Sequence, residues 1–249
     1  MFELYNDQAH RNLCVNNLSL GHMVDANQHI IIHDDEAMLL DPGGHKIFTR
    51  LFSQIARVMP INNLKYIFFS HQDPDIIASA NGWLMTTDIE AFLPSLWMRF
   101  ITHFGVDKMV SDRIIPLEDD GRIIHLGGVP LKVIPAHFLH SPGNYQIYDP
   151  ESKILYSGDL GASIGCTNEF VQDFDDHIQY MKAFHQRYMA GGKAMKAWAN
   201  TVRHLNIETI APQHGSILAG REIVRRFIDW IDDLPCGIDL LGERFTIPE

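Results

Sequence analysis

Four short apolar runs in this chain each lead into a histidine or an aspartate, and this recurrence limits the possible folds and functions more than any other feature. Apolar runs of this length, bounded by turn residues, predict buried β-strands. The polar side chains after the runs lie in the motifs Ser70-His71-Gln-Asp73-Pro-Asp75, His137-Phe-Leu-His140, Ser157-Gly-Asp159 and Pro212-Gln-His214. Rigid scaffolds commonly hold ligand-binding groups in loops at strand ends. We therefore expect a binding site where these strands end.

The other apolar patterns predict helices packed on sheets. Runs at residues 29–33 and 37–40 are separated by Asp34-Asp-Glu36, which predicts a hairpin. Apolar residues recur at helical spacing over residues 47–58, 192–205 and 221–233. Further strands are expected at residues 66–69, 129–134, 146–148, 153–156 and 208–211. Hairpins combined with alternating strands and helices predict a layered α/β fold, and the absence of a linker predicts a single domain over residues 1–249.

Charge and composition exclude several classes of protein. The 20 Lys and Arg residues are outnumbered by 31 Asp and Glu residues, and the resulting net charge of −11 disfavours binding to nucleic acid. No apolar run reaches the ~18 residues that span a bilayer, and the N-terminus carries acids where a secretory signal carries lysines. The three cysteines, Cys14, Cys166 and Cys236, are too few for a disulfide scaffold. We therefore expect a cytoplasmic protein that binds neither nucleic acid nor membrane.

The first motif carries the clearest metal-binding pattern. Alternate residues of an extended segment project to the same side, so His71, Asp73 and Asp75 can converge. A single His or Asp after a strand is commonly a turn residue or a helix cap, and turn chemistry alone explains Asp41 before Pro-Gly-Gly. The combination of this triplet with three more strand ends that bear His or Asp favours a metal site. A metal-free interaction domain, in which all these residues are structural, is the least favoured interpretation.

These motifs resemble those of the metallo-β-lactamase fold, and within it those of flavodiiron proteins and stand-alone oxygen-binding diiron proteins. The hydrolase branch of that fold has the motif His-x-His-x-Asp-His, whereas the diiron branch has His-x-Glu-x-Asp. This chain has a carboxylate, Asp73, at the second position, as in the diiron branch. His140-Ser-Pro-Gly resembles the third motif of the fold, Asp159 follows it at the family spacing of 19 residues, and Ile210-Ala-Pro-Gln-His214-Gly resembles the terminal histidine motif. The resemblance covers nearly the whole chain.

The resemblance implies an α/β fold of the metallo-β-lactamase type, an αββα four-layer sandwich, with a dinuclear iron site at one edge. The ligands that it implies are His71, Asp73 and His140 for the first iron, Asp75 and His214 for the second, and Asp159 as the bridge. Three carboxylates and a bridging hydroxide would neutralise two ferrous ions, which lowers the cost of burying the site. Carboxylate and imidazole ligands suit iron or manganese, and zinc is a possible substitute because raw affinity follows the Irving–Williams order.

Three positions carry alternatives. His140 has both the Ser-Pro-Gly continuation and the 19-residue step to Asp159, so we assign it as the ligand and interpret His137 as a turn residue or an outer neighbour. Asp73 is one methylene shorter than the glutamate of the flavodiiron motif, which changes its reach or its denticity. Ile76 replaces the final histidine of the hydrolase motif. It either leaves an open position beside the second metal or is a core residue.

The resemblance implies a non-haem diiron protein that binds, senses or reduces O2, with NO as a second candidate ligand. Flavodiiron enzymes continue into a flavodoxin-like domain, whereas this sequence stops at Glu249 and has no glycine-rich phosphate loop. We therefore expect a sensor or carrier, or an oxidase that needs a separate reductase, and we leave open a signalling partner and assembly as a homodimer. The alternative function is a zinc-dependent hydrolase of a thioester, lactone or phosphoester. Asp73 and Ile76 count against it, because they replace the two extra histidines of the hydrolase motif.

Overall fold

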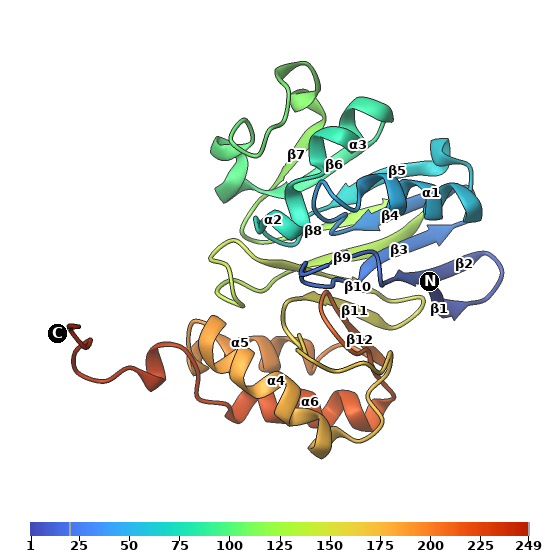
Figure 1. Cartoon of the computed structure of the whole chain (residues 1–249). Coiled ribbons are helices and arrows are strands. Elements are labelled where there is room, and N and C mark those ends of the chain that lie inside the picture. The colour runs from blue at the N-terminus through green and yellow to red at the C-terminus, as the bar shows by residue number, and fades with distance from the viewer. Residues whose placement is uncertain (20, 249) are drawn as a thin grey trace.

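Two β-sheets lie face to face in this computed structural model, which describes residues 1–19 and 21–248 (Figure 1). Within these residues the first sheet has seven strands in chain order: β1 (Phe2–Asn6), β2 (His10–Val15), β3 (Gln28–His33), β4 (Glu36–Leu40), β5 (Leu64–Phe68), β6 (Glu90–Pro94) and β7 (Ile114–Leu117). The second sheet has six strands in the order β13 (Leu218–Ala219), β12 (Thr209–Pro212), β11 (Ile154–Gly158), β10 (Tyr145–Asp149), β9 (Val129–Pro135) and β8 (Arg122–Leu126).

Helices cover the outer face of each sheet (Figure 1). The helices on the first sheet are α1 (Phe48–Val58), α2 (Pro74–Ile77) and α3 (Ala80–Thr86). Those on the second sheet are α4 (Phe174–Tyr188), α5 (Gly192–Val202) and α6 (Arg221–Asp233). Short 3₁₀ helices are η1 (Ile61–Asn63), η2 (Ser95–Phe100), η3 (Lys108–Arg113) and η4 (Ile238–Leu240). The predicted αββα four-layer sandwich is confirmed.

Strand alternation distributes the apolar side chains among three cores. In β3, Ile31 faces the second sheet, whereas its neighbours Ile30 and Ile32 face helices α1 to α3. A third core lies between the second sheet and helices α4 to α6, and it contains Trp198 and Phe227. Because each strand residue belongs to one side of its sheet, a shift of one residue would move apolar side chains to the wrong core. The strand register, and with it the position of each strand end, is therefore fixed by packing.

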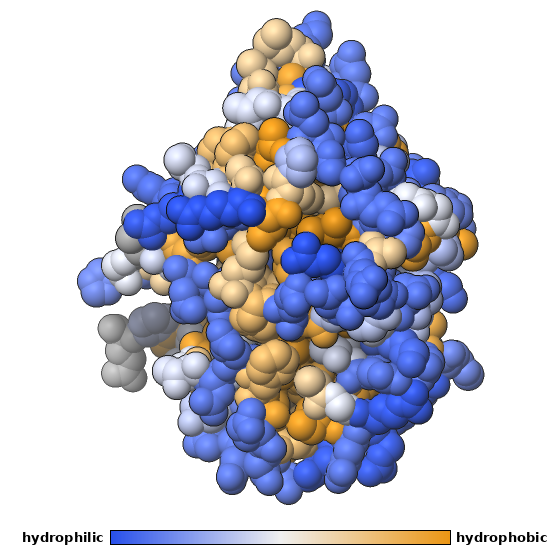
Figure 2. All heavy atoms as spheres, turned by 90° about the vertical axis from the view of Figure 1, so that its right-hand side faces the viewer, coloured by the Kyte–Doolittle hydropathy of each residue, from blue (hydrophilic) through white to orange (hydrophobic). Residues whose placement is uncertain are grey.

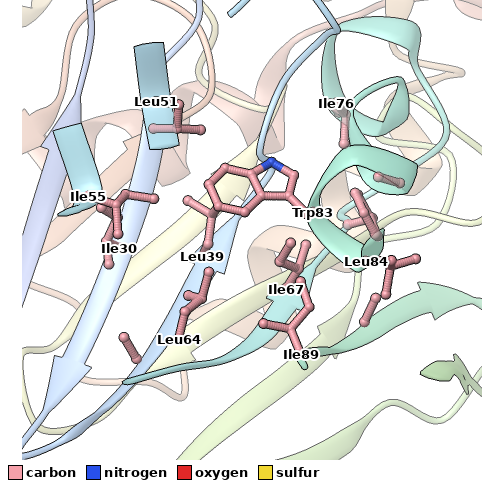
Figure 3. Packing of buried hydrophobic residues seen from close by; sticks show 14 of the residues in the cluster. Ile30, Leu39, Leu51, Ile55, Leu64, Ile67, Ile76, Trp83, Leu84 and Ile89 are labelled. Carbon is pink, nitrogen blue, oxygen red and sulfur yellow. The ribbon is translucent and has the colours of Figure 1, made fainter. Parts of the chain in front are cut away.

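Trp83 occupies the middle of the core between the first sheet and its helices, and its side chain is fully buried (Figure 3). It lies among aliphatic side chains that include Ile30 and Leu39 from the sheet and Leu51 from α1. Ile76 of α2 belongs to the same cluster and is 0% exposed. Of the two roles considered for Ile76, the role in the core is therefore confirmed.

The predicted elements agree with the observed ones, but strands β6, β7, β8 and β13 were not predicted. The helix expected over residues 192–205 ends at Val202, and residues 203–205 turn back toward β12. Helix α4 was not predicted, because His177 and His185 lie on its buried face and interrupt the apolar stripe. Strands β1 and β2 were also not predicted, and β2 contains the fully buried polar residues His10 and Asn12.

A buried polar cluster joins the two sheets at the far end of β10. The side chain of Asp149 is buried, and its Oδ2 accepts hydrogen bonds from His10 Nε2 (2.7 Å), Asn12 Nδ2 (2.8 Å) and Ser152 Oγ (2.6 Å). His10 and Asn12 belong to the first sheet, whereas Asp149 belongs to the second. Burial raises the pKa of Asp149, but the bonds from His10, Ser152 and Asn12 outweigh burial and hold this pKa below its usual value. The ionised carboxylate therefore stabilises the packing of sheet on sheet.

Figure 2 shows the side of the molecule that lies to the right in Figure 1. Most of this face is hydrophilic, and apolar side chains gather along a band through its middle.

Among the helices of the described residues, none combines the length and the apolar character that crossing a bilayer requires.

We expect Asp149→Asn to lower the free energy of unfolding by about 3 kcal/mol, because the substitution removes a buried charge that three donors share. Urea denaturation followed by circular dichroism at neutral pH measures this change. Glu3→Gln is the matched control, since Glu3 pairs with Arg11 at the surface of the neighbouring strand and should change stability little.

The lowered pKa of Asp149 also predicts that the free energy of unfolding depends on pH. A carboxylate whose pKa is lowered on folding stabilises the protein above the unfolded pKa of about 3.9, and this stabilisation is lost as the pH falls through the folded pKa. The difference in stability between the original chain and Asp149→Asn should therefore shrink as the pH falls below about 4. A difference that stays constant through this range would contradict an ionised Asp149.

Candidate metal centre

Six side chains from both sheets meet at the edge of the sandwich where the strands end. His71 follows β5, and Asp73 and Asp75 lie at the start of α2. His140 lies in the loop between β9 and β10, Asp159 directly follows β11, and His214 follows β12. The structure thus brings together all six residues that the sequence singled out. Their distances divide them into two groups.

The first group contains His71, Asp73, His140 and Asp159, whose ligand atoms all lie within 4.8 Å of one another. His140 Nε2 lies 2.9 Å from Asp159 Oδ2 and 3.4 Å from Asp73 Oδ2. His71 Nε2 lies 3.7 Å from each of the same two oxygens. Two imidazole nitrogens and two carboxylate oxygens therefore converge on one point, which is a donor set that suits a divalent metal ion.

The second group contains Asp75 and His214 and shares Asp159 with the first. His214 Nε2 lies 3.2 Å from Asp75 Oδ2 and 3.5 Å from Asp159 Oδ1. The two oxygens of Asp159 therefore face different groups, with Oδ2 toward His71 and His140 and Oδ1 toward His214. A carboxylate placed in this way can bridge two metal ions.

Several atoms that face the centre have no hydrogen-bond partner. His71 Nε2, His140 Nε2 and Asp159 Oδ1 are buried and unpaired within the described residues, although other polar atoms lie nearby. Buried polar atoms are normally hydrogen-bonded, so three orphaned atoms in one place require an explanation. Metal ions bound between these atoms would satisfy all three. The residues present therefore fit a metal site.

Neighbouring groups orient the histidines for metal binding. His214 Nδ1 lies 2.8 Å from the backbone carbonyl oxygen of Asp25, which can only accept, so Nδ1 carries a proton and Nε2 faces Asp75. Ser70 Oγ lies 2.9 Å from His71 Nδ1 and can accept a hydrogen bond from the N–H at that position. A hydrogen bond at the second ring nitrogen of this kind fixes the tautomer of metal-binding histidines.

The electrostatics of the centre favour a cation. Burial lowers the pKa of the His71 ring, but the adjacent carboxylates of Asp159 and Asp73 outweigh burial and raise this pKa to about 10. The same opposition raises the pKa of His140 and that of His214 to about 9 each. Burial raises the pKa of Asp159, but His140 and His71 hold it well below its usual range. The carboxylates thus stabilise positive charge, which metal ions provide when they displace the imidazole protons.

Gln72 links two of the ligand loops, and the sequence analysis assigned it no role. Its Nε2 donates to Asp73 Oδ1 (3.0 Å), and its Oε1 accepts from Ser141 Oγ (2.6 Å), next to His140. Because Oδ1 of Asp73 is engaged by Gln72, Oδ2 is the oxygen that faces His71 and His140. The shorter Asp73 therefore directs one oxygen toward the centre and the other toward Gln72. For Gln72, the only signal in the sequence is that it lies inside the first motif.

Two further residues hold ligand loops in place. Asp41, which the sequence analysis explained as a turn residue, is buried, and its Oδ1 accepts from the backbone N–H of Ser70 (2.8 Å). The fully buried His185 of α4 accepts at Nε2 from the N–H of Gly161 (2.9 Å) and donates from Nδ1 to the carbonyl of Met181 (2.8 Å). Burial lowers the pKa of His185 to about 4, so this ring is neutral and can accept. It therefore supports the turn after Asp159.

His137 lies outside the centre. Its Nε2 lies 3.4 Å from the backbone oxygen of Asp119, and its ring packs edge-on against Tyr145 at 5.1 Å between centroids. The structure places His140, and not His137, beside Asp73 and Asp159. The ring of His140 also packs against Tyr188 of α4, with centroids 5.6 Å apart.

The centre is open on one side. The side chains of Asp73 and Asp75 are 31% and 40% exposed, whereas that of His71 is fully buried and that of Asp159 nearly so. A small ligand can therefore approach from the side of α2.

The sequence profile of the ODP family beta lactamases matches residues 24–215, a span that contains all six of these residues. The chain belongs to the ODP family. This membership confirms the predicted resemblance to the oxygen-binding diiron branch of the metallo-β-lactamase fold.

Solved structures agree with the family assignment. A structure described as the peroxy diiron species of the chemotaxis sensor ODP is 39% identical to this chain, with a TM-score of 0.86, and the match covers 96% of this chain and 97% of that chain. The apo state of the chemotaxis sensor ODP from T. denticola is 38% identical over 96% of both chains, with a TM-score of 0.86. Rubredoxin oxygen:oxidoreductase from Desulfovibrio gigas has a TM-score of 0.78 at 16% identity over 93% of this chain and 61% of that chain, which shows similarity of fold alone.

Among curated proteins, the uncharacterized protein MJ0732 from Methanocaldococcus jannaschii is 25% identical over 212 residues. The match covers 80% of this chain and 51% of MJ0732, so this chain spans about half the length of that relative.

We expect Asp159→Ala to lose most of the bound metal, because its two oxygens face both groups of ligands. The unsubstituted chain should bind about two metal ions, the number in a dinuclear site. Elemental analysis after anaerobic reconstitution with ferrous iron measures this content. His137→Ala is the matched control and should keep the full complement, since its ring lies against Tyr145 and Asp119. Equal losses in the two variants would contradict the ligand assignment.

Gln72→Ala should weaken metal binding about 10–100-fold, the range that is typical when a group that orients a metal ligand is removed. Competition with a chromophoric chelator measures the affinity. Gln72→Glu separates the two contacts, because a carboxylate can still accept from Ser141 but cannot donate to Asp73. Affinity in Gln72→Glu equal to that of the original chain would show that the bond to Asp73 is unimportant.

Proposed function

We propose that this chain is a non-haem diiron protein that binds O2 and acts as an O2 sensor. The observation that carries this proposal is the geometry of Asp159, whose two oxygens face two separate groups of histidine and carboxylate ligands. Membership of the ODP family supports it, as does the match to a 39% identical chain that is described as a chemotaxis sensor in a peroxy diiron state. Two ferrous ions bound in such a centre supply the electrons on which O2 binding depends.

Each group of ligands has a defined task in this proposal. His71, Asp73 and His140 would hold one iron, Asp75 and His214 would hold the other, and Asp159 would be shared. The carbonyl of Asp25 and the hydroxyl of Ser70 keep Nε2 of His214 and His71 directed at the centre. Gln72 directs Oδ2 of Asp73 inward. Full burial of His71 excludes water on the inner side, and the exposed carboxylates leave an entry for a diatomic ligand.

Iron is the metal that we propose, in preference to zinc or manganese. The donor set of three imidazoles and three carboxylates is suited to iron or manganese, and the 39% identical solved structure is described as a peroxy diiron species. NO is a second diatomic that such a centre would accept. We propose that the output passes to a signalling partner and that any sustained reduction of O2 requires a separate reductase.

We also propose that the chain works as a single diiron unit in the cytoplasm. Both sheets contribute ligands and share one core, so neither half could form the centre alone. Cys14, Cys166 and Cys236 are all free thiols, which fits a reducing compartment.

A zinc-dependent hydrolase is not favoured. The family match is to the ODP branch, and Ile76 lies in the core instead of providing the extra histidine of the hydrolase motif. The resemblance of the ligand motif to the diiron branch leads to the same conclusion.

The proposed function predicts uptake of about one O2 per pair of irons when O2 is added to anaerobically reconstituted ferrous protein, with a change in visible absorption. An oxygen electrode and a spectrophotometer measure the two signals. Asp159→Ala should show neither signal, whereas His137→Ala should show both.

Two outcomes would contradict this function. The first is a chain that holds two irons and gives no uptake and no spectral change. The second is rapid hydrolysis of a generic thioester or lactone by the zinc form. If the substitution His71→Ala abolished this hydrolysis, the hydrolase function would be favoured.

A further inference from the structure

An apolar groove with a volume of about 630 Å³ lies between helix α5 and the loop that precedes His140. One wall is formed by residues of that loop, and the other by small side chains of α5 and the residues before it. The apolar lining includes Ala136, Phe138, Leu139, Ala194, Ala197 and Trp198. Phe138 is 51% exposed although it is a large aromatic residue. A concave apolar surface of this size is typical of a binding site.

The C-terminal segment, residues 241–248, carries apolar side chains that are largely exposed in the described structure. Leu241 is 54% exposed, Phe245 is 82% exposed and Ile247 is 87% exposed. Figure 1 shows this segment leading away from the body of the molecule beyond α6. A chain end with three exposed large apolar residues is suited to docking on another surface.

The start of the segment is anchored beside the groove. Ile238 and Asp239 both line the groove. The N–H of Ile238 donates to the carbonyl of Ala190 (2.9 Å), and Asp239 Oδ2 accepts from the N–H groups of Gly192 (2.6 Å) and Cys236 (3.1 Å). These bonds fix where the chain leaves η4, and beyond it the segment leads away from the body of the molecule (Figure 1).

We infer that the groove binds the C-terminal segment of a second copy of this chain. Lys193 at the groove can pair with Glu243 of the segment, whereas Asp239 is already held by the N–H groups of Gly192 and Cys236. Lys193, Glu243 and Arg244 form no ion pair among the described residues. Phe245 and Ile247 supply the apolar surface that the groove would cover. The segment therefore matches the groove in hydrophobicity and offers one carboxylate to Lys193.

Exchange of the segments produces a closed dimer. If each copy places its segment in the groove of the other, the two contacts are identical and related by a twofold axis. Eight extended residues span about 26 Å, which is long enough to reach a groove on a neighbouring molecule. The groove also adjoins the metal centre, because its wall at Phe138 and Leu139 continues directly into His140. The inference does not depend on bound metal, since it stands on apolar surface and charge.

Sedimentation velocity of the full chain over a range of concentrations tests the inference. We expect a dimer that is weakened at least about tenfold by Phe245→Ser combined with Ile247→Ser, and to a similar extent by Ala197→Glu in the groove. Both sites are exposed, so the fold should be retained, as circular dichroism can verify. Met109→Ser, which removes a side chain that is 76% exposed elsewhere on the surface, is the control and should leave the dimer unchanged. A chain that remains monomeric, or a dimer that survives both changes, overturns the inference.

Disulfide trapping distinguishes a second copy from the chain's own segment. Phe245→Cys and Ala197→Cys are made in separate chains, mixed and oxidised, and we expect a covalent dimer that contains one of each. Each variant oxidised alone controls for Cys166, the native thiol that is not buried. A single chain that carries both substitutions is oxidised in parallel. If a disulfide forms only within this chain and not between the two separate variants, the segment folds back on its own groove and the inference is overturned.

Discussion

The burial of Asp159 between three histidines is the interaction on which the rest of the structure depends. A buried carboxylate is strongly unfavourable unless cations or donors surround it, and here His71, His140 and His214 do so from three directions. This arrangement requires that loops from both sheets end within a few ångströms of one another. The turn after Asp159 is correspondingly well supported, because the Gly161 N–H is bonded to the buried ring of His185. Metal ions bound at this edge would make so much buried charge tolerable.

The interior of the sandwich is apolar in the middle and polar at both ends. At one end of β10, the N–H of Tyr145 donates to the carbonyl of Ser70, next to the metal centre. At the other end, Asp149 binds His10 and Asn12 across the sheets. The two polar clusters define the alignment of the sheets, because each places charged or hydrogen-bonded groups that only one arrangement can satisfy. Hydrophobic packing between them fixes the strand registers and hence the position of the ligands.

The ligand motif acts together with residues that bind no metal themselves. Asp73 is shorter than the residue that the diiron motif normally has, and Gln72 engages one of its oxygens so that the other faces the centre. Ile76 stands where the hydrolase motif has a histidine, yet its side chain belongs to the core around Trp83. The departure from the hydrolase motif is therefore a matter of packing as much as of metal binding. Such a change would be difficult to reverse without leaving a cavity or a buried imidazole.

The sequence by itself determined the layered α/β class, seven of the thirteen described strands, helices α1, α5 and α6, and the six polar residues at the strand ends, because these follow from local periodicity and local motifs. It did not predict α4 or β2, since the buried polar residues His177, His185, His10 and Asn12 interrupt their apolar patterns, and it also missed strands β1, β6, β7, β8 and β13. The tertiary structure agrees with the choice of His140 over His137, and it alone gave Gln72 its role and placed Ile76 in the core. The physical reason is the same in each case. The partners of a side chain depend on which loops and layers the fold brings together. Spacing along the sequence does not indicate which distant residues come into contact.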